Sequence, residues 1–374
     1  MAHMWFGDLV TMRWWDDLWL NESFAEYLGT RVTAEATRFD QAWTTFAMRR
    51  KAWGYAADQR PPPTRSPRRR WPTPTRAAQL RRHLVRQGAS VLRQLVAWLG
   101  DEAFLAGLNA HFAAHRFGNA TLADLLASLS TSSGRDLSDW AESWLRRPQV
   151  NTLRAEVAVD ADGHYTEVAV VQTAPESHPV LRPHRIGVGR YSADGTVRRD
   201  EVDIDPAADG GRTVLGELTG APAARLLLLN DGDLTFAKVR LDRASADAVP
   251  LVLPCLTDPL ARAVLWGEAL DATKDGERPV TGLVDLIVAA LPAETEVIIA
   301  EDVLTLSRSL VDRYLDPPTR ATALAGSPSH AIGCSTARRP VSRCSSPPPE
   351  VGSPPPPTPT CSSVGSPAGT YRPV

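Results

Sequence analysis

The spacing of apolar residues changes from a helical period to a period of two near Thr152, and this change constrains the fold more than any other feature. Helical spacing precedes it in residues 102–115, 121–129 and 137–145. Apolar and polar residues then alternate in residues 153–159, 165–172, 185–191, 197–204 and 224–229. Helical spacing returns in residues 259–271, 280–290 and 295–314. The sequence therefore predicts a multidomain α+β chain with a β-sandwich between two helical parts.

The first 59 residues are rich in large apolar side chains and predict a helix from about Asn21 to Thr37. Asn21 is a suitable residue to cap the first turn. Phe24, Leu28 and Val32 then fall on one face. Glu22 and Glu26 share another face, one helical turn apart.

Two segments interrupt this well-patterned sequence. Residues 60–86 contain nine arginines, six prolines and no acidic residue, which disfavours both a helix and a buried strand. Beyond Pro317 the chain is rich in Pro, Ser and Thr, and we expect disorder there. A shifted reading frame in a GC-rich gene would produce both changes of composition.

Composition excludes some partners. A formal net charge of -2 and a pI near 6.5 give no general electrostatic reason to bind nucleic acid or an anionic membrane. Apolar runs such as Leu286 to Leu291 are far shorter than the roughly 20 residues of a membrane-spanning helix. The start of the chain lacks the pattern of a secretory signal, so we expect a cytoplasmic protein without membrane or nucleic-acid partners. Four cysteines without close pairing give no zinc-thiolate pattern.

One constellation near the start of the chain carries chemistry. His3 precedes Gly7-Asp8-Leu9-Val10-Thr11, and Glu22 follows His3 by nineteen positions within Trp19-Leu20-Asn21-Glu22-Ser23-Phe24-Ala25-Glu26-Tyr27. A histidine and a glutamate at this distance indicate nothing by themselves, and Glu22 alone would be read as a solvated carboxylate on a helix; the inference depends on the whole run. The whole run resembles the end of the H-E-x-x-H, eighteen residues, E pattern of the aminopeptidase N family of gluzincin-type zinc metallopeptidases.

The resemblance extends over residues 1–59 and 88–316 and includes the run from Leu228 to Arg240, which is similar to the actinobacterial branch of the family. It implies four parts. They are the helical C-terminal part of a thermolysin-like catalytic domain (1–148, with an irregular insert at 60–87), an antiparallel β-sandwich (149–242), the start of a helical C-terminal domain (243–316) and a disordered tail (317–374).

The resemblance also implies roles for single residues. His3 corresponds to the second zinc histidine, Glu22 to the zinc carboxylate, and Glu26 to a group that orients a ligand by hydrogen bonding. The implied activity is zinc-dependent removal of N-terminal amino acids from peptides. His111, His115, His178, His184 and Arg185 match no zinc or catalytic position of the family.

Several departures from the family pattern predict an inactive chain. The first zinc histidine, the general-base glutamate and a G-x-M-E-N segment that recognises the substrate amine would all precede Met1. Val85 stands where the family has a tyrosine that stabilises the oxyanion, and valine donates no hydrogen bond. We therefore expect weak Zn²⁺ binding. The alternative is a non-catalytic protein that binds phosphates through its disordered Arg/Pro segment.

Overall fold

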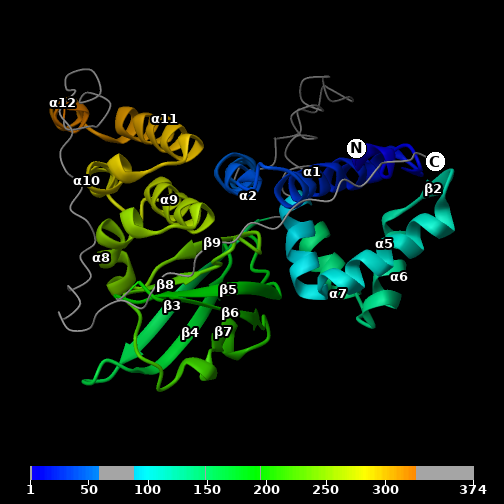
Figure 1. Cartoon of the computed structure of the whole chain (residues 1–374), viewed down its shortest axis with the longest axis horizontal. Coiled ribbons are helices and arrows are strands. Elements are labelled where there is room, and N and C mark those ends of the chain that lie inside the picture. The colour runs from blue at the N-terminus through cyan, green and yellow to red at the C-terminus, as the bar shows by residue number, and fades with distance from the viewer. Residues whose placement is uncertain (1, 59–87, 148, 194, 326–374) are drawn as a thin grey trace, which may run out of the picture. The chain divides into compact units, whose positions relative to one another are not determined.

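In the computed structural model of the chain, residues 2–58, 88–147, 149–193 and 195–325 are described (Figure 1). Most of the first described elements are helices, strands follow, and helices return after residue 242. The Arg/Pro segment and the chain beyond residue 325 lie outside the described residues. Predictions about them stay predictions.

The first helical part packs around one hydrophobic core that includes Phe6, Phe24 and Phe104. It contains η1 (Ala2–Met4), β1 (Val10–Met12), η2 (Trp15–Asp17), α1 (Leu18–Ala36), α2 (Ala42–Thr45), η3 (Phe46–Lys51), α3 (Ala52–Asp58), a helix over residues 88–99, α5 (Asp101–His115), β2 (Gly118–Ala120), α6 (Leu122–Ser133), α7 (Ser138–Ala141) and η4 (Glu142–Arg146). Strands β1 and β2 pair in parallel and so fix the start of the chain to the turn after α5.

Helix α1 begins at Leu18, one turn before the predicted start. The 3₁₀ turn η2 runs directly into it, so the helix needs no new nucleus at Asn21. Asn21 is therefore not the cap, and its amide instead donates to the sulfur of Met12 at 3.1 Å. Helix α6 follows the sequence signal more closely, because Thr121 and Asp124 form a capping box and Gly134 ends the helix at φ 67°.

The strands form a sandwich around a second core that takes side chains from both sheets. Within the described residues one sheet has the order β7-β4-β3-β9 and the other the order β6-β5-β8. Their bounds are β3 (Asn151–Val159), β4 (Tyr165–Thr173), β5 (His184–Tyr191), β6 (Val197–Ile204), β7 (Arg212–Val214), β8 (Leu226–Leu229) and β9 (Ala237–Arg240), with short turns η5 (Asp209–Gly211) and η6 (Gly216–Leu218). The prediction of a wholly antiparallel sandwich was wrong, because β3 and β9 pair in parallel.

The sequence did not reveal β9. All four of its residues are buried, yet two of them are Lys238 and Arg240. Because these charged residues alternate with Ala237 and Val239, the sequence suggests a segment with one face exposed to solvent. Both sides are covered because acidic side chains of helix α9 neutralise these cations. A strand whose burial depends on partners about thirty residues away gives no local signal.

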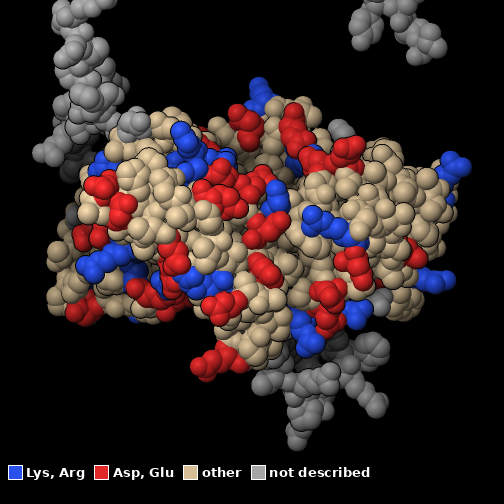
Figure 2. All heavy atoms as spheres, turned by 90° about the horizontal axis from the view of Figure 1, so that it is seen from below, with Lys and Arg blue, Asp and Glu red and all other residues tan. Residues whose placement is uncertain are grey.

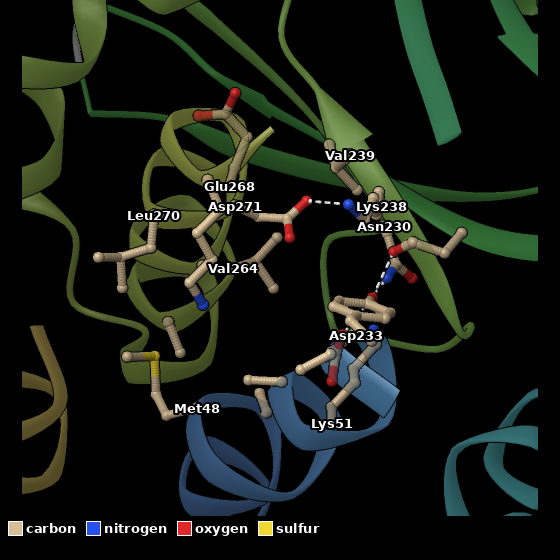
Figure 3. A pocket seen from close by; sticks show the side chains of 18 of the residues that line it. Met48, Lys51, Asn230, Asp233, Lys238, Val239, Val264, Glu268, Leu270 and Asp271 are labelled. Carbon is tan, nitrogen blue, oxygen red and sulfur yellow. Dashed lines mark hydrogen bonds and ion pairs between the residues drawn. The ribbon is translucent and has the colours of Figure 1, made fainter. Parts of the chain in front are cut away.

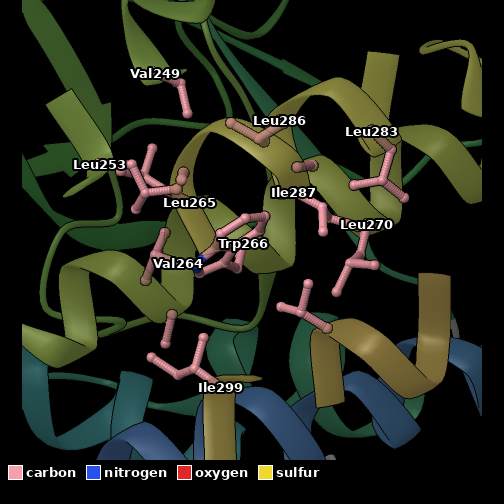
Figure 4. Close-up of a cluster of buried hydrophobic side chains, with 14 of the residues drawn as sticks. Val249, Leu253, Val264, Leu265, Trp266, Leu270, Leu283, Leu286, Ile287 and Ile299 are labelled. Atoms are coloured by element: carbon pink, nitrogen blue, oxygen red, sulfur yellow. The ribbon is translucent and has the colours of Figure 1, made fainter. Parts of the chain in front are cut away.

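The helices after the sandwich share a third core, with Trp266 fully buried at its centre (Figure 4). They are α8 (Arg243–Val252), η7 (Leu253–Cys255), α9 (Pro259–Lys274), α10 (Val280–Ala290), η8 (Leu291–Ala293), α11 (Val297–Tyr314) and α12 (Pro317–Ala325). Asp258 caps α9 by accepting from the Leu260 amide, and Pro259 occupies the first helical position. Among the described helices, none combines the length and apolarity that crossing a membrane requires.

Helix α12 corrects the predicted start of the disordered tail at Pro317. Pro317 and Pro318 occupy the first turn, where a missing amide proton costs nothing. The Asp316 carboxylate accepts from the Thr319 amide at 2.8 Å and caps the helix. The proline-rich composition thus starts a helix here instead of preventing one.

Gly187 allows strand β5 to approach the loop after β8. A Cβ atom at Gly187 would overlap the backbone oxygen of Asp231, whose amide donates to the Gly187 carbonyl at 3.0 Å. We expect Gly187→Ala to lower the free energy of unfolding by about 2–3 kcal/mol through overpacking. Urea unfolding followed by circular dichroism measures this.

Gly29→Ala is the matched control, because Gly29 lies within α1 and a Cβ atom there meets nothing within 4 Å. It should stabilise the chain by about 0.5–1 kcal/mol, since glycine is a poor helix former. Equal effects of the two substitutions would contradict the close approach at Gly187.

Candidate metal centre

The turn η1 is held against helix α1 by aromatic packing. Phe6 is buried and stacks on Phe24 with ring centroids 4.1 Å apart. Gly7 turns the chain at φ 129°, and a Cβ atom there would lie 3.3 Å from the backbone oxygen of His3. Glycine at this position therefore lets the chain turn closely around His3, which fixes His3 over the first turns of α1.

His3 and Glu22 lie side by side. The Nε2 atom of His3 is 4.0 Å from the Oε2 atom of Glu22, and their side chains are 54% and 42% exposed. Two ligands of one tetrahedral zinc ion, each bound at about 2.1 Å, stand about 3.4 Å apart. A small movement of either side chain would bring the pair to that separation.

A hydrogen bond sets the tautomer of His3. Its Nδ1 atom lies 3.2 Å from the carbonyl oxygen of Phe6, and a carbonyl can only accept, so Nδ1 carries the proton. The Nε2 atom, which faces Glu22, then has the free lone pair that a metal ion needs. A backbone carbonyl behind a histidine is a common partner in metal sites.

Glu26 lies one turn after Glu22, and its carboxylate pairs with Arg50 Nε at 3.1 Å. This ion pair connects α1 to the π-helical turn η3. The structure gives no direct contact of Glu26 with His3, and its predicted role in orienting a ligand stays a prediction. Val85 lies outside the described residues.

The pair is smaller than a complete zinc site. Among the described residues, no group of three or more His, Cys, Asp or Glu side chains is arranged to hold a metal ion. Zinc sites in proteins take at least three protein ligands. The imidazole and the carboxylate suit zinc, but a further donor has to come from other residues.

A second cluster of charged residues was missed by the sequence analysis. Lys51, at the end of η3, is buried and pairs with Asp233 of the loop after β8. It also donates to the Thr235 carbonyl at 2.6 Å. Burial lowers the pKa of Lys51, although Asp233 opposes that shift. The available signal was the rarity of lysine, because Lys51, Lys238 and Lys274 are the three lysines of the chain.

His184 is another buried polar residue. It starts β5 and packs edge to face on Trp144, with ring centroids 5.1 Å apart. Its Nδ1 atom is 2.8 Å from the hydroxyl of Thr235. Burial, and then repulsion by Arg182 and Lys51, lower the pKa of His184 to about 3. This histidine is therefore neutral in the folded chain and belongs to the interface of helices and sandwich, away from His3.

Comparison with known proteins shows which families and relatives this chain resembles. Residues 1–144 match the peptidase family M1 domain, and residues 226–326 match the ERAP1-like C-terminal domain. The chain is 41% identical to Aminopeptidase N of Streptomyces lividans over 342 residues, which are 87% of this chain and 39% of that protein. It is 31% identical to Aminopeptidase N of Lactobacillus helveticus, over 67% of this chain and 28% of that protein.

A further relative, Aminopeptidase N of Lactococcus lactis subsp. lactis, is 36% identical over 43% of this chain and 19% of that protein. The chain thus spans well under half the length of these three relatives.

The buried His184 predicts a dependence of stability on pH. An unfolded histidine has a pKa of about 6.5. Between that value and about 3 the unfolded chain binds a proton that folded His184 does not. Stability from this group is therefore complete above about pH 6.5 and is lost as the pH falls.

His184→Asn keeps a polar group near Thr235. We expect it to reduce the loss of unfolding free energy on acidification below about pH 6.5 by about 1.4 kcal/mol per pH unit. Urea unfolding at pH 7 and pH 5 measures the slope, and His178→Asn controls for the removal of a loop histidine. An unchanged slope in His184→Asn would exclude this residue as its source.

Proposed function

The chain belongs to peptidase family M1, and on that premise we propose that it takes part in zinc-dependent removal of N-terminal amino acids from peptides. The relatives named Aminopeptidase N support this reaction class. The single observation in the structure that carries the proposal is the approach of His3 Nε2 to Glu22 Oε2 at 4.0 Å. Peptides with a free N-terminus are the proposed substrates.

In this proposal His3 and Glu22 are zinc ligands. His3 offers Nε2 because the Phe6 carbonyl holds the proton on Nδ1. Glu22 supplies a carboxylate oxygen from the second turn of α1, and its side chain is partly exposed to solvent. A bound zinc ion supplies Lewis acidity toward the scissile carbonyl and activates water at neutral pH.

Glu26 has a supporting role in the proposal. Its ion pair with Arg50 joins α1 to η3 and so limits rotation of the helix that carries Glu22. A group of this kind acts on zinc through the ligand that it positions, and its loss typically costs about 10–100-fold in metal affinity.

We propose the same division of the chain as the sequence predicts. Residues 1–148 belong to the catalytic domain, residues 149–242 to the sandwich, and residues from 243 to a helical C-terminal domain. Support comes from three hydrophobic clusters, each centred on one part, although Met48, Leu226 and Leu228 join the cluster of the last part. Zinc-dependent peptide hydrolysis also requires a third zinc ligand, a general base and a hydrogen-bond donor to the oxyanion. The described residues near His3 offer no group for these three roles.

A polypeptide of these 374 residues should therefore bind zinc weakly and should not cleave alanyl or leucyl chromogenic amides above background. Removal of a general base alone typically costs about 10²–10⁴ in rate. Metal analysis after dialysis and an amidase assay with and without chelator provide the measurements. One retained zinc per chain, or chelator-sensitive turnover, would contradict this expectation.

A longer chimera tests the site itself. The segment of the Streptomyces relative that precedes the aligned region is placed before Met1, and residues 60–87 are replaced by its corresponding segment. Glu22→Ala should then abolish retained zinc and lower turnover by more than about 100-fold, because a ligand is lost. Glu26→Gln should weaken zinc binding by about 10–100-fold.

Glu35→Ala is the matched control, since Glu35 lies on the same helix and pairs with Arg31 at 2.9 Å with its side chain 59% exposed. It should retain zinc and activity. Full zinc retention by Glu22→Ala would refute the role of Glu22, whereas loss of zinc in all three variants would point to a general folding defect.

A further inference from the structure

A cavity lies where the two helical parts meet the sandwich. It is bounded by η3 and α3 on one side, by β9 on the second and by α9 on the third (Figure 3). The cavity encloses about 90 Å³ and does not include His3 or Glu22. Nothing in the proposed zinc chemistry uses it, so its ligand has to be inferred from its own walls.

The lysines of the chain all line this cavity. Of 41 Lys and Arg residues, three are lysines, and Lys51, Lys238 and Lys274 all contribute to its walls. All other basic side chains of the sequence are arginines, and one of them, Arg240, also lines the cavity. A lysine presents a compact ammonium group, whereas arginine presents a wide planar fork. The three ammonium groups of the chain thus gather around one cavity.

Two of the three ammonium groups are neutralised by the protein. Lys51 pairs with Asp233, and Lys238 lies 2.5 Å from Asp275 and 3.2 Å from Asp271. The remaining acid of the wall, Glu268, pairs with Arg278 at 3.2 Å. Every acidic group of the wall thus has at least one cation within ion-pair distance, and Asp271 shares Lys238 with Asp275.

Lys274 differs from the other two lysines. It stands at the end of α9, is exposed, and forms no hydrogen bond or ion pair with any described residue. Lys274 therefore has no carboxylate within ion-pair distance among the described residues, although Asp271 and Asp275 attract it from farther away. A ligand with one negative charge would complete the pairing.

The rest of the wall is largely apolar. Figure 3 shows Val264 on the side of α9 that faces the turn carrying Lys51, with Met48 and Leu270 at the left of the view; all three line the cavity. Methionine adapts its shape to different apolar ligands. Gly267, on the same helix, leaves open space because a Cβ atom there would meet nothing within 4 Å. These features suit a short, branched hydrocarbon group.

We propose that this cavity binds a small carboxylate with an apolar body, with Lys274 pairing to the carboxylate and Met48, Val264 and Leu270 packing on the hydrocarbon part. Lys274 is the one lysine of the wall without a close carboxylate, and this favours a ligand with one negative charge over a polyanion. Free apolar amino acids and simple branched-chain acids share the required chemistry. The inference is independent of the zinc site and of the proposed reaction.

The rarity of lysine makes a direct test practical. The 374-residue chain is labelled with ¹³C and ¹⁵N in lysine alone, which gives signals from three side chains, and Lys274→Arg assigns the signal of Lys274. The probes are 4-methylpentanoate, L-leucine and the neutral 4-methylpentanamide, with chelator present throughout. We expect saturable shifts of the Lys274 signal with a carboxylate and none with the amide.

Two variants complete the test. Lys274→Met should weaken carboxylate binding by about tenfold or more, the worth of one charge-assisted hydrogen bond. Gly267→Leu should fill the open space and abolish binding while it retains or raises thermal stability, since glycine is unfavourable within a helix. Because it removes no contact, it remains informative if Lys274→Met folds poorly.

The outcomes separate the sources of the ligand. Tighter binding of L-leucine than of 4-methylpentanoate identifies an amino acid as the ligand class, and the reverse order identifies a carboxylic acid without an amino group. The proposal is overturned if neither carboxylate shifts Lys274, if the amide binds equally well, or if Gly267→Leu binds like the parent.

Discussion

The neutralisation of buried charge around β9 and the loop before it is the interaction on which the rest of the described structure depends. Lys51 reaches from the first helical part to Asp233, and Lys238 and Arg240 reach from the sandwich to acids of α9. Removing one member of such a pair leaves a charge in a poorly hydrated place, at a cost of about 3–5 kcal/mol. The apolar cores build each part, and these ion pairs decide which surfaces meet.

The same arrangement connects the candidate metal centre to the rest of the chain. Lys51 ends the π-helical turn η3, and Arg50, its neighbour in that turn, pairs with Glu26 of α1. Helix α1 carries Glu22 one turn before Glu26. The turn η3 therefore contacts the sandwich through Lys51 and holds α1, the helix that carries Glu22, through Arg50. Placement of Glu22 depends in part on contacts far from it in sequence.

The sequence predicted the features that arise from local rules. Periodicity located α5, β4 and α10 to within a residue or two, whereas the approach of His3 to Glu22 was predicted by family resemblance. Features that depend on distant partners were missed. The parallel pairing of β3 with β9 and the burial of Lys238 require the acids of α9, which no local pattern reveals.

The start of α1 was misjudged for a related reason. A good capping residue, Asn21, was present, but a preceding 3₁₀ turn had already begun the helix. The roles of Glu26 and of the position of Val85 could be inferred only by family resemblance, because neither follows from spacing or chemistry alone.

Helix α12 illustrates how little tertiary packing a described helix can have. It has no buried residue, and its cap at Asp316 and a hydrogen bond from Arg320 to the Leu315 carbonyl at 3.0 Å are local. Strand β8, by contrast, is buried along its whole length. Amide protons of α12 should thus exchange with solvent through local fraying of the helix. Amide protons of β8 should exchange only when the whole domain unfolds. Along one chain, protection from exchange would span nearly the whole range that a folded protein shows.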